Sequence, residues 1–87
     1  MMGEFNIGDI IVHIGGNGVF IVSGWYERPP WYNLGWLAGD KQTILYTDDV
    51  IERIDATYVK VDHCSISNTK EIIKKLDKLM VSLKKGA

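Results

Sequence analysis

The sequence predicts a mainly β domain, a small antiparallel barrel of five to six short strands, followed by a C-terminal amphipathic α-helix. Over residues 5–62, short β-branched and aromatic runs alternate with turn residues, which is the pattern of a small all-β domain. After residue 67 the apolar spacing changes to three and four residues, which is helical. We therefore expect residues 1–66 to form the barrel and residues 67–87 to form the helix.

The first two strands are expected at Ile10–Ile14 and Val19–Trp25. Successive residues of a strand point to opposite faces, so Ile10 and Ile11 are expected on different sides of the sheet. Gly15–Gly18 lies between the two strands and contains Asn-Gly, a strong signal for a tight hairpin. The second strand is apolar on both faces, which predicts a central rather than an edge position.

The remaining strands are expected after a proline pair that no helix or central strand can cross. Trp31–Leu37 and Gln42–Thr47 have the pattern of a second hairpin, and Tyr58–Val61 that of a short last strand. Between them, Thr47–Asp49 is either a turn or the cap of a single helical turn over Asp49–Ile54.

The C-terminal segment is predicted to be a helix with one apolar face. Asn68 and Glu71 have the spacing of a capping box at its start. Its apolar face either packs on the barrel or pairs with another copy, which would make a homodimer. The apolar stripe consists of Ile72, Leu76, Leu79 and Leu83, widened by Ile73 and Met80.

Composition excludes several classes of protein. Hydrophobic residues make up 46% and charged residues 24% of the 87 residues, so the chain is not disordered. No apolar run is long enough to cross a membrane, so we expect no membrane association. The single cysteine, Cys64, excludes an intramolecular disulfide and, with no secretion signal, favours a cytoplasmic location.

The net charge of −1 is unevenly distributed. Residues 1–62 carry nine acids and four bases, whereas residues 63–87 carry two acids and six lysines. The acidic N-terminal part would repel phosphates, so a strongly basic nucleic-acid-binding domain is not indicated, and only the C-terminal segment could attract them.

The N-terminal motif resembles that of a known group of small barrels. Phe5-x-Ile7-Gly8-Asp9-Ile10-Ile11, a glycine-bearing turn and Val19–Val22 are similar to the start of SH3-like small β-barrel proteins. The closest patterns are those of YodC-like small bacterial proteins and the Tudor-like beginning of CarD-type domains. The resemblance covers about residues 5–54. It implies an SH3-like barrel and a bacterial or bacteriophage source, with Trp36 in the place of a mid-barrel tryptophan.

An aromatic stretch is the strongest functional signal. All three tryptophans and two of the four tyrosines lie within residues 25–36, beside a proline pair that stiffens the loop. Aromatic residues and arginine are enriched at protein interfaces, because they bury large areas at low entropic cost. Trp36 is expected in the core and the other four aromatic residues nearer the surface. The candidate partner-binding residues are Trp25, Tyr26, Arg28, Trp31, Tyr32 and Trp36.

No motif for catalysis, for a cofactor or for a metal is found. The glycine-rich segment 15–18 lacks the Lys-Ser/Thr of a phosphate-binding loop and is better explained as a hairpin turn. His63 and Cys64 are neighbours, so in a strand they point to opposite faces and do not share a ligand or a proton. Cys64 is expected to be a small buried apolar residue.

The sequence therefore predicts a non-enzymatic interaction module without cofactors, most simply an adaptor or inhibitor that binds another protein through the aromatic loop. The alternative is a nucleic-acid-binding module in which the aromatic loop stacks on bases and helix lysines contact phosphates. The lysines in question are Lys70, Lys74, Lys75 and Lys78.

Overall fold

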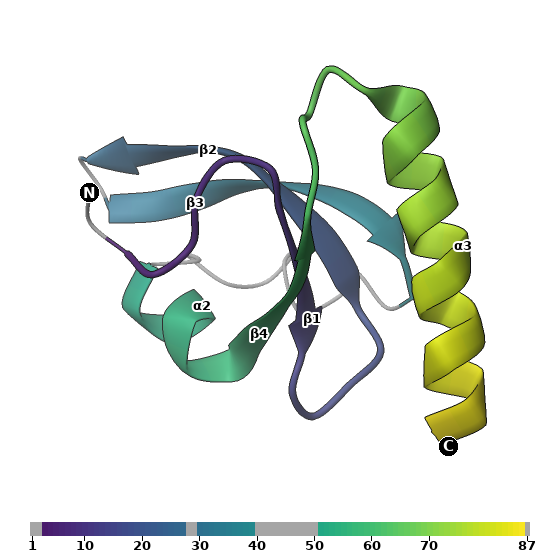
Figure 1. Cartoon of the computed structure of the whole chain (residues 1–87). Coiled ribbons are helices and arrows are strands. Elements are labelled where there is room, and N and C mark those ends of the chain that lie inside the picture. The colour runs from purple at the N-terminus through teal and green to yellow at the C-terminus, as the bar shows by residue number, and fades with distance from the viewer. Residues whose placement is uncertain (1–2, 28–29, 40–50, 87) are drawn as a thin grey trace.

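The computed structural model describes residues 3–27, 30–39 and 51–86, in which four antiparallel strands form one sheet with a helix on each face (Figure 1). The strand order is β3-β2-β1-β4. The elements are β1 (Asp9–His13), β2 (Val19–Glu27), β3 (Pro30–Ala38), α2 (Ile51–Thr57), β4 (Tyr58–His63) and α3 (Thr69–Gly86).

The described strands do not form the closed barrel of five to six strands that the sequence predicted. β2 and β1 are central, as expected for β2, whereas β3 and β4 each pair with one described strand only. The strand expected at Gln42–Thr47 lies outside the described residues. The helical turn expected up to Ile54 is a helix, α2, which lies directly before β4.

The two faces of the sheet carry separate apolar clusters, because successive strand residues point to opposite sides. Ile11 and Phe20 belong to the cluster that packs against α2, whereas Ile10 and Val19 belong to the cluster that packs against α3. This confirms the alternation predicted for the first strand. The sheet is thus buried on both faces over its central strands.

The start of α3 follows the predicted capping box. The backbone N–H of Glu71 donates to Asn68 Oδ1 at 3.1 Å, and Asn68 Nδ2 donates to Glu71 Oε2 at 3.1 Å. These bonds satisfy one of the N–H groups that a helix leaves unpaired at its N-terminus. The face of α3 that packs on the sheet consists of Ile72, Leu76, Leu79 and Met80.

A tight turn leads into β1 and depends on Gly8 and Asp9. Gly8 has φ +97°, the left-handed region that favours glycine, and its N–H donates to the carbonyl of Val22 at 2.8 Å. Asp9 N–H donates to the carbonyl of Asn6 at 3.0 Å, and Asp9 Oδ2 accepts from Asn6 N–H at 2.8 Å. The Gly8-Asp9 pair of the N-terminal motif therefore shapes the turn that leads into β1.

Candidate functional site

The structure distributes the aromatic stretch over both faces of the β2–β3 ribbon. Trp25 pairs with Tyr32, and both pack in or against the α2-side cluster. Trp31, one residue before Tyr32 on β3, points to the opposite face and is half-buried. Arg28 lies outside the described residues, and the side chain of Tyr26 is not among those described. The predicted single aromatic surface is therefore not assembled from Trp25, Trp31, Tyr32 and Trp36.

Two of these aromatic residues are placed opposite to expectation. Tyr32 is buried in the core, whereas Trp36 is 50% exposed. Tyr32 is buried because its hydroxyl finds hydrogen-bond partners there. Trp36 pairs with Phe20 but stands on the outermost strand of the described sheet, so Phe20 belongs to the buried cluster and Trp36 does not.

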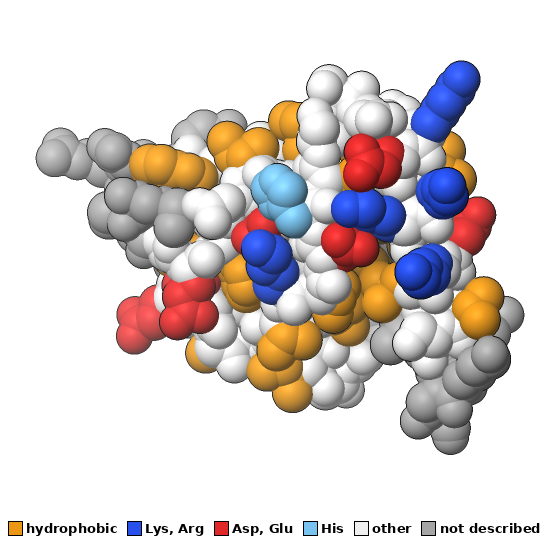
Figure 2. Space-filling view, viewed as in Figure 1, with side chains coloured by type: hydrophobic (Ala, Val, Ile, Leu, Met, Phe, Trp, Pro, Cys, Tyr) orange, Lys and Arg blue, Asp and Glu red, His pale blue; other side chains and the backbone are white. Residues whose placement is uncertain are grey.

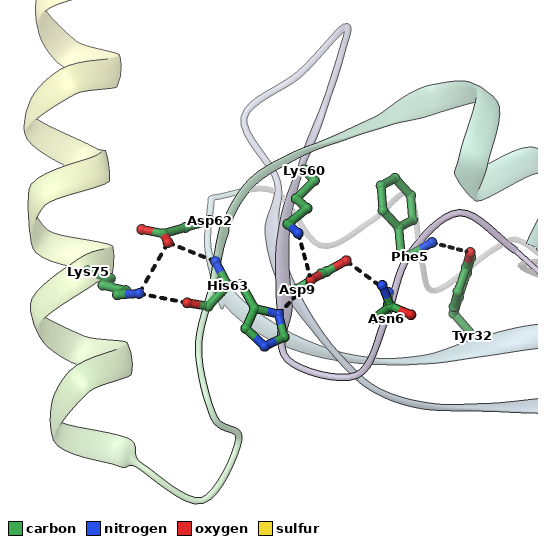
Figure 3. A network of polar contacts seen from close by, with 8 residues as sticks. All are labelled: Phe5, Asn6, Asp9, Tyr32, Lys60, Asp62, His63 and Lys75. Atoms are coloured by element: carbon green, nitrogen blue, oxygen red, sulfur yellow. Dashed lines mark hydrogen bonds and ion pairs between the residues drawn. The ribbon is translucent and has the colours of Figure 1, made fainter. Parts of the chain in front are cut away.

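The Tyr32 hydroxyl links three segments of the chain. It donates to Asp55 Oδ1 at 2.6 Å. It also accepts from the backbone N–H of Phe5 at 3.1 Å (Figure 3). Burial, reinforced by the hydrogen bond to Asp55, raises the pKa of Tyr32 well above its ordinary value of 10.0, so the hydroxyl keeps its proton. Tyr32 is therefore a core residue that joins β3 to α2 and to the N-terminal turn.

Replacing Tyr32 by phenylalanine is expected to lower the free energy of unfolding by about 1–3 kcal/mol, because the buried Phe5 N–H loses its acceptor and Asp55 loses a donor. Urea denaturation followed by tryptophan fluorescence measures this loss. Asn33→Ala, at an exposed neighbouring position on β3, is the control and is expected to stay within about 0.5 kcal/mol of wild type. Equal stability of Tyr32→Phe and wild type would contradict the role of the hydroxyl.

The outer edge of β3 has no charged side chain. Its nine residues are Pro, Trp, Tyr, Asn, Leu, Gly, Trp, Leu and Ala, and no other strand within the described ranges pairs with its outer side. Natural edge strands are usually protected from other chains by charges, bulges or covering segments. β3 contains a bulge at Leu37, but it presents a half-exposed Trp36 and no charge along its length.

The opposite edge, β4, is protected in several ways. It carries Lys60 and Asp62, and Val61 is an extra residue that bulges out of the pairing with β1. Lys75 of α3 donates to the carbonyl of His63 at 2.6 Å and to Asp62 Oδ1 at 3.2 Å (Figure 3). β4 is a poor site for a further strand, because it is charged, bulges at Val61 and has its His63 carbonyl already bonded to Lys75. The two edges of the sheet are therefore chemically unlike.

Asp9, a buried carboxylate next to β4, is the centre of a polar cluster that the sequence patterns do not reveal. Asp9 is 1% exposed, and its Oδ1 contacts His63 Nδ1 at 2.7 Å and Lys60 Nζ at 3.4 Å (Figure 3). These partners lie more than 50 residues away in sequence, so only the pairing of β1 with β4 brings them to Asp9. Among the described residues, no hydroxyl or thiol hydrogen-bonds to the His63 ring. We therefore interpret the cluster as a clamp between the N-terminal turn and β4.

The Asp9 clamp predicts a loss of stability in acid. Burial alone raises the pKa of Asp9, but hydrogen bonds from Asn6 N–H, His63 and Lys60 outweigh it and hold that pKa below its ordinary 3.8. A carboxyl with a lowered folded-state pKa stabilises the fold above its unfolded value, and this stability is lost as the pH falls through the folded value.

Urea midpoints of wild type and Asp9→Asn, measured from pH 6 down to pH 2, test this expectation. Asp9→Asn is expected to be less stable by about 1.5–3 kcal/mol at pH 6, with the difference shrinking at pH values below 3.8. The other carboxyls titrate in both proteins, so the difference isolates Asp9. A difference independent of pH would contradict the clamp.

The α3 lysines lie away from Trp36. Lys75 is engaged with Asp62 and with Glu71, whereas Lys70, Lys74 and Lys78 are exposed and follow one another at four-residue spacing along the helix. Figure 2 shows basic side chains gathered on the α3 side of the molecule. α3 covers one face of the sheet, and the pairing of Trp36 with Phe20 places Trp36 on the other. A surface that combines Trp36 with the lysines is therefore not formed.

Cys64 is buried in the α3-side cluster, as predicted, while His63 points to Asp9 on the other side. Within residues 3–27, 30–39 and 51–86, no group of three or more His, Cys, Asp or Glu side chains is placed to hold a metal ion. Neither described helix is long and apolar enough to cross a membrane. No family model, curated protein or solved structure matches this chain.

Proposed function

We propose that this chain is a non-enzymatic protein-interaction domain that docks on another polypeptide through β3, with the exposed Trp36 as the anchor. The observation that carries the proposal is that β3, the outermost strand of the described part of the sheet, has nine residues without a single charge and leaves Trp36 half-exposed. A large, partly exposed aromatic side chain on an uncharged strand is a suitable anchor for another protein. Among the residues of the aromatic stretch, Trp36 is the anchor and Trp31 a flanking contact.

We also propose a family and a cellular location for this chain. We propose an SH3-like domain of a small bacterial or bacteriophage protein that acts in the cytoplasm as an adaptor or inhibitor. The N-terminal motif Phe5-x-Ile7-Gly8-Asp9 supports the family, and the single buried cysteine, Cys64, is compatible with a reducing compartment.

Trp36→Lys is expected to abolish partner binding while the fold is retained, because the exposed aromatic anchor is replaced by a charged side chain that stays in water. Tagged wild type, Trp36→Lys and Val59→Lys are compared as baits in cell extract, with and without nuclease. Val59 is 46% exposed on β4, so Val59→Lys is a matched control at the other edge. A partner retained by wild type and Val59→Lys, lost with Trp36→Lys and insensitive to nuclease supports the proposal. A partner that Trp36→Lys retains equally well contradicts it.

The second candidate is nucleic-acid binding through α3. The row of Lys70, Lys74 and Lys78 favours it, since lysines at four-residue spacing present charge along one side of a helix. This function requires oligonucleotide affinity that falls steeply with salt. The triple variant of these lysines to alanine should remove the affinity, and Trp36→Lys should leave it unchanged.

A further inference from the structure

The two histidines of the chain are held in opposite tautomers. His63 Nδ1 lies 2.7 Å from Asp9 Oδ1, and because an ionised carboxylate only accepts hydrogen bonds, this nitrogen carries the proton. His13 Nδ1 accepts from the backbone N–H of Gly15 at 3.2 Å, so the neutral ring of His13 carries its proton on Nε2. The neutral ring of His63 therefore has its lone pair on Nε2, whereas the lone pair of His13 is already engaged with Gly15.

The Nε2 atom of His63 is accessible. The side chain is 52% exposed, and within the described ranges no residue hydrogen-bonds to this nitrogen. Figure 3 shows the second ring nitrogen of His63 pointing away from Asp9. A Cβ on Gly8 would lie 2.9 Å from His63 Cε1 and 3.3 Å from Nε2, so a glycine at position 8 leaves this edge of the ring uncovered. An electrophile can therefore reach the lone pair without a change in the fold.

The charges around His63 favour an electrophile that is itself an anion. Lys60 Nζ contacts Asp9 Oδ1 at 3.4 Å, and His63 Nδ1 contacts the same oxygen, so the ammonium group lies beside the imidazole. Half of the Lys60 side chain is exposed, which leaves N–H donors for phosphoryl oxygens. The neighbouring acid, Asp62, is paired with Lys75 at 3.2 Å. The buried carboxylate of Asp9 also stabilises the positive charge that the ring gains when Nε2 forms a new bond.

We propose that His63 is a phosphorylation site, with Nε2 as the atom that accepts the phosphoryl group, Asp9 as the positioning residue and Lys60 as the cation that binds phosphoryl oxygens. The donor class is a phosphoramidate, in which phosphorus is bonded to a protonated nitrogen. Nε2 forms a bond to phosphorus while the P–N bond of the donor breaks, and the donor nitrogen leaves with that electron pair as a neutral amine. Nδ1 keeps its proton and its bond to Asp9, so the cationic phosphorylated ring stays paired with a carboxylate. This inference goes beyond the proposed docking through β3 and does not depend on it.

Labelling with phosphoramidate itself tests the proposal. The folded wild-type chain is expected to gain a single phosphoryl group, at His63 and at least about tenfold faster than at His13. His13→Gln is the matched control and is expected to be labelled as wild type is, whereas His63→Gln loses the label. In concentrated urea, where Asp9 no longer holds the ring, both histidines are expected to react at similar rates.

Intact mass and phosphorus NMR measure the extent and the position of the label. Equal labelling of the two histidines in the folded chain overturns the proposal, as does a folded chain that takes no label. A phosphoryl group on Nδ1 of His63 also contradicts it, because that nitrogen is assigned to the bond with Asp9.

The role of Asp9 has a spectroscopic test that needs no variant. Nitrogen NMR of the wild type, at a pH where both rings are neutral, is expected to show His63 protonated at Nδ1 and His13 protonated at Nε2. His63 protonated at Nε2 would overturn the proposal, because the lone pair would then be absent from the exposed nitrogen.

Asp9→Asn tests the same role by rate. With its fold verified by circular dichroism, this variant is expected to be labelled at His63 about tenfold more slowly, because a neutral amide stabilises the charged ring less than a carboxylate does. An unchanged rate contradicts the positioning role. If Asp9→Asn does not fold, the tautomers of the wild type and the contrast between His63 and His13 decide.

Discussion

Replacing Phe20 by alanine is expected to lower the free energy of unfolding by about 3–5 kcal/mol, a large share of the roughly 5–15 kcal/mol that stabilises a small domain. Phe20 lies on the central strand β2, is almost completely buried, and meets the ring of Tyr58 edge-on with 5.9 Å between ring centroids. Truncation removes this contact and leaves a cavity between the sheet and α2, whose Ile51 and Ile54 line the same cluster.

Urea denaturation measures the loss in Phe20→Ala. Two controls bracket it: Phe20→Leu keeps most of the volume and is expected to cost less, and Ile14→Ala, at a largely exposed position after β1, is expected to change stability by about 0.5 kcal/mol or less. If Phe20→Ala were as stable as Ile14→Ala, the position of the core would be wrong.

Gly8→Ala is the second large effect, an expected loss of about 3 kcal/mol or more. The φ of +97° costs any other residue about 1–3 kcal/mol. In addition, a Cβ at this position would overlap the carbonyl oxygen of Cys64 and approach His63 Cε1 at 2.9 Å. The Cys64 backbone cannot move away freely, because its N–H donates to the carbonyl of Gly8 at 2.9 Å.

Gly15→Ala is the matched control for Gly8→Ala. A Cβ on Gly15 would meet nothing closer than His13 Cε1 at 3.6 Å, and no positive φ is found there. Thermal unfolding of the two variants should therefore show a large drop in Tm for Gly8→Ala and little change for Gly15→Ala. Similar drops in both variants would contradict the close approach of Gly8 to Cys64.

Much of the local structure could be predicted from the sequence, because it depends on neighbouring residues. The alternation of Ile10 and Ile11, the hairpin between β1 and β2 and the Asn68 cap are short-range patterns, and the structure confirms them, although Asn17 and Gly18 do not take the positive φ of an Asn-Gly turn. From the sequence, the Gly8-Asp9 pair is recognisable only as part of a motif, without a structural reason. Its reason, the contact of Gly8 with Cys64 and of Asp9 with His63, depends on strand pairing across the chain.

The aromatic stretch shows where sequence patterns fail. Tyr32 was expected at the surface and Trp36 in the core, yet burial depends on what each side chain meets rather than on its type. Tyr32 finds Asp55 and Phe5 as hydrogen-bond partners, while Trp36 stands on the outermost described strand and stays half-exposed. Neither strand order nor bulges are encoded in local spacing, so the contrast between a protected β4 and an uncharged β3 edge becomes visible only in the folded sheet.

Hydrogen–deuterium exchange of the β3 and β4 amides, in the dilute isolated chain and in its complex, tests the central claim most directly. The complex is the chain with a captured partner. If β3 is the docking edge, exchange at residues 30–38 slows in the complex while exchange at residues 58–63 is unchanged. Slower exchange at β4 or α3, with β3 unchanged, would contradict docking through the β3 edge.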